Sequence, residues 1–114
     1  MSDTIFAKII RKEIPSDIVY EDDVMLAFRD INPKAPEHIL LIPKKPVATV
    51  NDIEESDAEL VGQMVLRAAK IAKDLGFAGE GYRLVFNCNK HGGQDVYHIH
   101  LHLLGGRQMT WPPG

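Results

Sequence analysis

The chain has 114 residues, and its 13 lysines and arginines stand against 16 aspartates and glutamates, for a formal net charge of -3. A protein that holds DNA or RNA through counterion release carries a clustered basic excess. The longest basic cluster here is the pair Lys44-Lys45, which argues against a nucleic-acid partner but not against a single mononucleotide. Since this length supports one hydrophobic core, we expect a single domain over residues 1–114.

Cysteine content and hydropathy bear on the compartment. The single cysteine, Cys88, cannot form an internal disulfide, which favours a reducing environment. No apolar run reaches the ~18 residues that a membrane span needs, and residues 1–13 lack the apolar core of a signal peptide. We therefore expect a cytoplasmic protein with no membrane partner.

The first part of the chain predicts a short helix followed by strands. Thr4 can cap a helix over residues 5–10, and Pro15 closes that segment. Strands are expected at residues 17–20, 24–28 and 38–42. The proline-containing stretch 31–36 is expected to be a loop, and the continuous apolar run of the third strand suits burial on both faces.

One long helix is well marked in the second part. Ser56 and Glu59 have the spacing of a capping box, apolar residues including Val65 and Leu75 then recur with a helical period, and Gly76 supplies the stop. Two further strands are expected at residues 82–87 and 97–104. The order predicts an α+β fold, with a mostly antiparallel five-stranded sheet, one long helix on one face and a short N-terminal helix.

Three of the five histidines fall within five residues, at His98, His100 and His102. Alternate side chains of a strand share a face, so the three imidazoles are expected together on one face of the last strand. One interpretation is a solvated strand face, and another is a metal site. The outer pair would lie roughly 13 Å apart along an unbent strand, which makes it difficult for all three to share one ion.

A third interpretation is chemistry at phosphorus. A neutral imidazole is a good nucleophile, and neighbouring imidazoles discourage each other's protonation, which keeps the central one free to attack. An outer histidine can hold or deliver a proton. The preceding turn, Gly92-Gly93-Gln94, can bring backbone amides close to an anion. Together these residues favour phosphoryl or nucleotidyl transfer.

The run from His98 to Leu104 resembles the His-φ-His-φ-His-φ-φ signature of the histidine-triad (HIT) nucleotide hydrolases and transferases. Residues 3–15, 27–31 and 105–114 are similar to the Hint branch of that superfamily, the purine nucleoside phosphoramidases. The resemblance implies a HIT-like fold, a homodimer and hydrolysis of purine nucleoside 5′-phosphoramidates (AMP or GMP conjugates) to the monophosphate and an amine. It implies no metal and no cofactor.

The resemblance also implies catalytic roles. In the family the middle histidine attacks the α-phosphorus and forms a covalent nucleotidyl-histidine, which water then hydrolyses. Here His100 would be that nucleophile, His98 would orient it, and His102 would bond the phosphate oxygens. His38 would support the triad from the neighbouring strand.

Nucleotide-binding residues follow from the same resemblance. The residues implied are Ile5, Phe6, Ile9, Phe28 and Ile31 around the purine, Asp30 at the ribose, and Asn87, Gly93, Gln94 and Asp95 near the phosphate, together with His100 and His102. Trp111, in the tail, would reach the partner subunit's active site. Without the resemblance, the apolar residues of this set would be assigned to the core.

One position departs from the family pattern, because Asp95 stands where many animal members carry a serine. An ionised carboxylate only accepts hydrogen bonds and would repel the substrate's charge. Asp95 either points away, is protonated, or pairs with the leaving ammonium, which leaves open the preferred amine and the pH profile. Three alternatives to the phosphoramidase stay open: a nucleotide-binding interaction module with vestigial hydrolysis, a dinucleoside polyphosphate hydrolase, and a zinc-binding regulatory protein.

Overall fold

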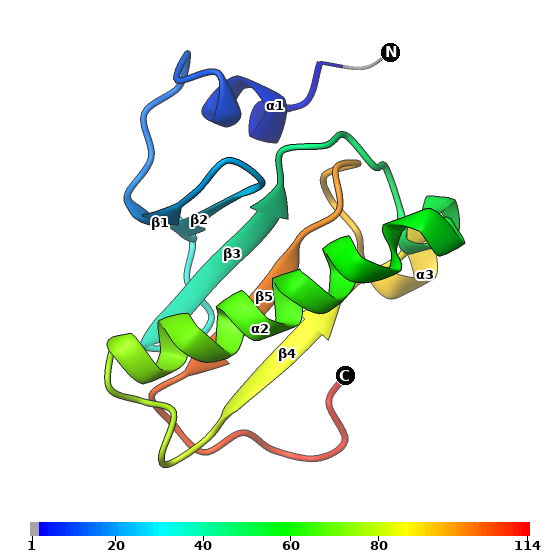
Figure 1. The fold of residues 1–114 in the computed structure, drawn as a ribbon. Helices are drawn as coiled ribbons and strands as arrows, with labels where there is room; N and C mark the ends of the chain where they lie inside the picture. The colour runs from blue at the N-terminus through cyan, green and yellow to red at the C-terminus, as the bar shows by residue number, and fades with distance from the viewer. Residues whose placement is uncertain (1–2) are drawn as a thin grey trace.

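The computed structural model describes residues 3–114, coloured from blue to red along the chain in Figure 1. Its helices are α1 (Ile5–Ile10), α2 (Ala58–Asp74) and α3 (Asn89–Gly92), with short 3-10 turns η1 (Val50–Asp52) and η2 (Glu55–Asp57). Its strands are β1 (Ile18–Glu21), β2 (Met25–Arg29), β3 (Glu37–Pro43), β4 (Tyr82–Phe86) and β5 (Leu101–Gly105). None of the helices in this described range is long and apolar enough to cross a membrane.

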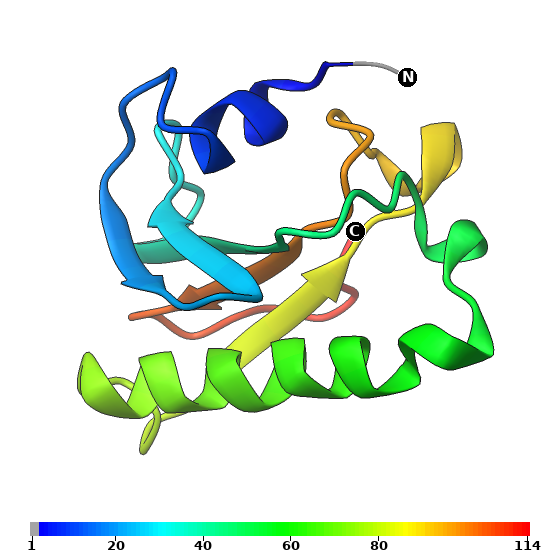
Figure 2. The same cartoon turned by 45° about the horizontal axis from the view of Figure 1, so that its top comes forward.

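The strands form one sheet in the order β1-β2-β3-β5-β4, and every neighbouring pair is antiparallel. The last strand of the chain, β5, is therefore an interior strand, between β3 and the edge strand β4. Figure 2 shows the sheet between the long helix α2 on one side and the short helix α1 on the other. The predicted α+β fold, with a five-stranded antiparallel sheet, one long helix and a short N-terminal helix, is confirmed.

Strand periodicity divides the buried residues between the two faces of the sheet. One set of alternate residues packs against α2: Met25, Ala27, Ile39, Leu41, Leu101 and Leu103. The intervening residues pack with Phe6 and Ile9 of α1: Leu26, Phe28, Leu40 and Ile42. Burial on both faces explains the continuous apolar run of β3, as its sequence predicted. On β5, His102 lies between Leu101 and Leu103 and faces the α1 side of the sheet.

Helix signals were predicted at the start of α1 and at both ends of α2, and the structure confirms two of the three. Thr4 caps α1, since its Oγ1 accepts a hydrogen bond from Ala7 N at 3.1 Å. Gly76, with φ 89°, ends α2 in the left-handed conformation that glycine favours. The capping box predicted at Ser56 is wrong: α2 starts at Ala58 after η2, and the side chain of Asp57 instead accepts from Glu54 N and Lys45 Nζ.

The predicted apolar stripe of α2 is broader than the surface the sheet covers. Its buried residues are Met64, Ala68, Ile71 and Ala72. Val65 and Leu75, which the stripe included, are each 41% exposed. The spacing of the buried set is that of one narrow helical face, and Val65 lies one residue, or about 100°, away from it.

The last strand starts later than predicted, at Leu101 instead of Tyr97. Ile99 N donates to Val47 O at 2.7 Å, in the connection after β3, so the chain is held away from the sheet ladder until residue 101. His98 and His100 therefore precede the strand, and only His102 lies on its face. The predicted start of the strand is therefore wrong, but the imidazoles still lie on one side of the chain: His98 and His100 both lie edge-on to Phe6 of α1, and the His100 and His102 centroids are 5.0 Å apart. Ile99, Leu101 and Leu103 pack on the α2 side.

Gly105 closes β5 against a ring that leaves no room for a side chain. A Cβ added there would lie 2.4 Å from Cδ1 of Phe77, which itself packs against the α2 side of the core. We expect Gly105→Ala to lower the free energy of unfolding by about 1–3 kcal/mol, measured by urea denaturation. The matched control is Gly79→Ala, where nothing lies within 4 Å of the new methyl group. Equal stability of the two variants would contradict this packing.

Candidate active site

A cavity of about 700 Å³ lies on the α1 side of the sheet. This volume falls within the range of small-molecule and cofactor sites. Nine of the predicted site residues line it: Ile5, Phe6, Ile9, Phe28, Asp30, Ile31, Asp95, His100 and His102. The fold thus brings the predicted purine slot, ribose carboxylate and two of the three triad histidines to one place.

His100 is buried on the wall of this cavity, 4% exposed, with the ring of Phe6 edge-on at 5.0 Å between centroids. Its Nδ1 lies 2.9 Å from the carbonyl oxygen of His98. A carbonyl oxygen only accepts, so Nδ1 carries the proton and the lone pair of the neutral ring is on Nε2. Nε2 lies 3.7 Å from Oδ1 of Asp95. The neutral ring of His100 therefore has its lone pair on Nε2, at the wall of the cavity.

His102 has the opposite tautomer, imposed by a chain of three groups. Lys34 N donates to His38 Nδ1 at 3.0 Å, so the proton of neutral His38 is on Nε2. His38 Nε2 lies 2.9 Å from His102 Nδ1 and donates to it. The proton of neutral His102 is consequently on Nε2, a buried atom that has no hydrogen-bond partner within residues 3–114. This atom is a ready donor for a ligand oxygen.

His38 and His102 meet because of the sheet register. His38 pairs with Leu104, and Leu40 pairs with His102, in the antiparallel ladder of β3 and β5. The two histidines are therefore diagonal neighbours on the α1 face, a geometry that lets long or aromatic side chains touch. Their ring centroids lie 5.1 Å apart.

Burial keeps these histidines neutral. It lowers the pKa of His38 and of His98 below the ordinary histidine value. For His102, burial and then the neighbouring His100 and His38 lower the pKa to about 4. A neutral His102 at physiological pH keeps the donor on Nε2 and adds no positive charge beside His100.

His98 acts on the cavity through its backbone. Its own Nε2 donates to Pro43 O at 2.7 Å, and its imidazole lines a separate cavity between α1 and the Lys44–Ala48 segment. The predicted orientation of His100 thus comes from the His98 carbonyl oxygen and not from its ring.

The nucleoside end of the cavity combines buried and exposed apolar groups. Phe6 and Phe28 are buried and meet edge to face at 5.5 Å, whereas Ile5 is 50% exposed and Ile31 is 99% exposed. Exposed apolar side chains at a cavity mouth offer a contact surface to a flat apolar ring. Asp30 lies beside them, and its Oδ1 accepts from Asn32 N at 2.8 Å, which fixes the carboxylate.

Asp30, His38 and His102 also form a group whose ligand atoms lie within 4.8 Å of one another, close enough to hold a metal ion. His38 Nε2 and His102 Nδ1 are joined by the hydrogen bond already described. Lys34 N donates to His38 Nδ1, so the proton of neutral His38 is on Nε2. A metal ion bound there would have to displace that proton.

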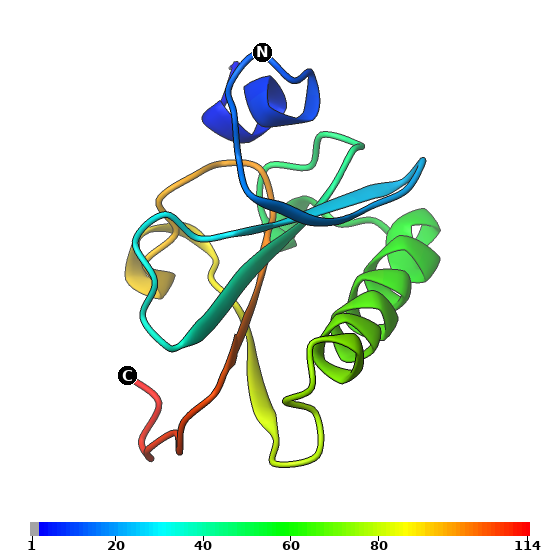
Figure 3. The same ribbon diagram turned by 90° about the vertical axis from the view of Figure 1, so that its left-hand side faces the viewer.

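Six predicted residues do not line this cavity in the part of the chain that the structure describes: His38 and His98, placed above, and Asn87, Gly93, Gln94 and Trp111. The amides of Gly93 and Gln94, expected to hold an anion, donate to Lys90 O and Asn89 O. The Gln94 side chain is buried and binds Ala48 O, Val96 O and Asn89 N, so it anchors the loop. Trp111 is 81% exposed in the tail, which Figure 3 shows at the end of the sheet away from α1.

Some functional groups had no signal in the sequence. The amide of Lys34 sets the tautomers of two histidines, and it lies in the proline-containing loop, where no pattern marks an individual donor. Leu40 also lines the cavity, and here a signal existed, because Leu40 is two residues from His38 on a strand.

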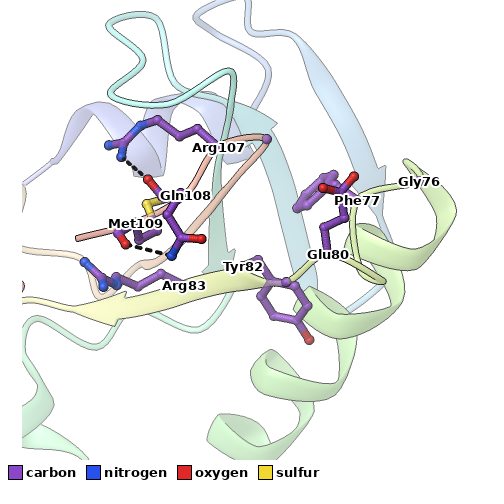
Figure 4. A pocket seen from close by; sticks show the side chains of 10 residues that line it. Gly76, Phe77, Glu80, Tyr82, Arg83, Arg107, Gln108 and Met109 are labelled. Atoms are coloured by element: carbon purple, nitrogen blue, oxygen red, sulfur yellow. Dashed lines mark hydrogen bonds between the residues drawn. The ribbon is translucent and has the colours of Figure 1, made fainter. Parts of the chain in front are cut away.

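Figure 4 shows another cavity, of about 490 Å³, between the α2–β4 connection and the start of the tail. It contains two arginines, but both hold the tail: Arg83 donates to Thr110 O, and Arg107 donates to Gln108 O and Lys34 O. Its lining includes no histidine, so it is not the candidate active site.

Comparison with known proteins identifies the family of the chain. The family model described as HIT domain matches residues 11–109. The purine nucleoside phosphoramidase of Escherichia coli (strain K12) is 60% identical over 107 residues, which cover 94% of this chain and 90% of that protein. An uncharacterized HIT-like protein of Synechocystis is 55% identical over 112 residues, covering 98% of this chain and 97% of that protein.

Solved structures give the same result. The HIT family hydrolase from Legionella pneumophila superposes with a TM-score of 0.95 at 60% identity, covering 96% of this chain and 98% of that one. A histidine triad protein from Clostridium difficile gives a TM-score of 0.93 at 45% identity, with 96% of each chain covered. On its sequence, its fold and the histidines of its cavity, this chain belongs to the HIT domain family.

Proposed function

We propose that this protein hydrolyses the P–N bond of purine nucleoside 5′-phosphoramidates, giving a nucleoside monophosphate and an amine. The observation that carries this proposal is the lone pair of His100 Nε2 on the cavity wall, fixed there by the bond from Nδ1 to the His98 carbonyl. The E. coli relative, 60% identical, bears the name purine nucleoside phosphoramidase and supports the substrate class.

The proposed reaction has two displacements at the α-phosphorus. His100 Nε2 forms a bond to phosphorus as the P–N bond breaks, and the leaving amine takes a proton from solvent. The His98 carbonyl stabilises the charge that develops on the imidazole, since it holds the Nδ1 proton. Water then attacks the nucleotidyl-His100 intermediate and releases the monophosphate and the free imidazole.

His102 has an electrostatic role in this mechanism. Its Nε2–H is the unpartnered buried donor of the cavity, and a non-bridging phosphate oxygen would accept from it. Leaving a buried donor unsatisfied costs about 1–3 kcal/mol, so its satisfaction by substrate favours binding and the charged transition state. His38 is a positioning residue, because it acts through His102 Nδ1.

The nucleoside is assigned to the other end of the cavity. The purine would contact Ile5, Ile31 and the Phe6–Phe28 pair, and the ribose hydroxyls would donate to Asp30, whose carboxylate is only an acceptor.

The function rests on His100, and its substitution tests it. We expect His100→Gln to lower turnover of an adenosine 5′-phosphoramidate by at least about 10³-fold while AMP binding, measured by calorimetry, is retained. His91→Gln is the matched control, since His91 is exposed on α3 and outside the cavity. Denaturing mass spectrometry of the quenched wild type should locate a nucleotidyl group on His100. Retained turnover in His100→Gln would refute the nucleophile, and AMP binding without turnover in the wild type would favour a binding module.

The neutral state of His102 predicts a pH-dependent stability. Its pKa is about 4 in the folded chain against 6.5 as the reference, so protonation favours the unfolded state. The free energy of unfolding should therefore fall as pH drops from about 6.5 to about 4, with His102 contributing on the order of 1–3 kcal/mol. Measured by urea denaturation across this range, the free energy of unfolding should change less steeply with pH in His102→Gln than in wild type or His91→Gln. The same pH dependence in all three proteins would contradict a neutral His102 in the folded chain.

We also propose that the protein works as a homodimer whose tails complete the partner's sites. Strand β4 is an edge strand with one side unpaired in the single chain. Trp111 is 81% exposed and does not line the cavity of its own chain. Both features suit association of two copies, with Trp111 of one chain near the cavity of the other.

Mixed dimers test this arrangement. Trp111→Ala should raise KM about fivefold, the loss expected for one aromatic contact, while light scattering still reports two chains. Mixing the Trp111→Ala and His100→Gln proteins and allowing exchange should restore the wild-type KM, because a working His100 then receives the partner's intact tail. A monomer in light scattering, or no recovery on mixing, would contradict the proposal.

A further inference from the structure

Asp95 is the carboxylate of the cavity closest to the proposed nucleophile. Its Oδ1 lies 3.7 Å from His100 Nε2, and its side chain is 84% exposed at the cavity mouth. The backbone on either side is anchored, because the buried Gln94 side chain binds Ala48 O, Val96 O and Asn89 N. The fold therefore fixes where this carboxylate is attached and leaves its oxygens open to solvent.

The charge of Asp95 is not neutralised by the protein. Within residues 3–114, no lysine or arginine forms an ion pair with it. Asp17, the other exposed carboxylate of the lining, lies 3.8 Å from Arg29 Nε. Arg29 is the one cation among the described lining residues, and it also bonds Glu37 at 2.9 Å. A substrate thus meets the carboxylate of Asp95 beside the reacting centre and that of Asp30 at the nucleoside end, neither of them paired with a lysine or arginine among the described residues.

The distance from this charge to the substrate is bounded. A phosphorus atom poised for attack sits about 3–3.5 Å from the nucleophile, so it lies no more than about 7 Å from Asp95 Oδ1. In an in-line displacement the amine departs on the side of the phosphorus away from His100 Nε2. Charges separated by such distances near a protein surface interact appreciably, and the sign decides whether the interaction is favourable.

We propose that Asp95 is a specificity-determining residue for the leaving group, favouring phosphoramidates of amines that carry a second, cationic group and disfavouring those that carry a carboxylate. This inference rests on the proposed phosphoramidase activity and adds the class of amine to it. The phosphate charge is common to all substrates, so its repulsion by Asp95 does not discriminate between them. The charge at the far end of the amine differs between substrates, and Asp95 therefore discriminates by it.

A matched substrate series tests the inference. Adenosine 5′-phosphoramidates of putrescine, n-pentylamine and γ-aminobutyrate present a cationic, a neutral and an anionic end on similar chains. For the wild type we expect kcat/KM to favour the cationic over the anionic substrate by about tenfold at low salt, a ratio that shrinks as ionic strength rises. The difference should appear mainly in KM, since the remote charge acts similarly in the ground and transition states.

Substitutions at Asp95 give the decisive comparison. Asp95→Asn, which keeps the shape, should bring the cation-to-anion ratio to within about twofold of unity, and Asp95→Lys should invert it. Asp23→Asn, an exposed acidic position outside the cavity, should keep the wild-type ratio. An unchanged ratio in Asp95→Asn, with the neutral substrate still hydrolysed, would overturn the role of Asp95 alone. Absence of wild-type turnover on all three substrates would overturn the phosphoramidase and this inference together.

Discussion

The hydrogen bond from His100 Nδ1 to the carbonyl oxygen of His98 is the contact on which the chemistry of the cavity depends. A regular strand would point that carbonyl sideways into the sheet ladder, where it could not meet a side chain two residues along the same chain. The bond forms because Ile99 N donates to Val47 O and the chain joins the sheet only at Leu101. A local departure from β structure thus determines which nitrogen of the nucleophile holds the lone pair.

Two neighbouring histidines have opposite tasks and are held in opposite tautomers. The backbone carbonyl of His98 accepts from His100 Nδ1 and so keeps the proton of His100 there, whereas the backbone amide of Lys34 acts through His38 to place the proton of His102 on Nε2. Asp30 Oδ2 also lies 3.5 Å from His38 Nε2, so this carboxylate favours the same proton position on His38. Because peptide groups do not titrate, the arrangement is insensitive to pH as long as burial keeps His38 and His102 neutral.

The sequence predicted the architecture well because hydrophobic periodicity is a local property. Strand alternation placed Leu101 and Leu103 against α2 and His102 opposite them, and the structure has that arrangement. The site was predictable only in part. Alternation could not reveal that His98 leaves the sheet, since this depends on Val47 O, more than fifty residues earlier. The turn at Gly93 and Gln94 looked like an anion site, yet its amides are used within α3 and its connection. Contacts distant in the chain decided both positions.

The cavity is also unusual in how it would meet a phosphate. The lining offers no free cation in the described chain, since Arg29 is paired with Glu37 and Asp17. Neutral, oriented donors can stabilise an anion without placing a positive charge beside His100. The carboxylate of Asp95, whose Oδ1 lies 3.7 Å from His100 Nε2, would by itself oppose phosphate binding. Its side chain is 84% exposed, however, so water screens its charge. The exposure of Asp95 therefore limits the repulsion of the phosphate while leaving the carboxylate free to meet whatever group the leaving amine carries.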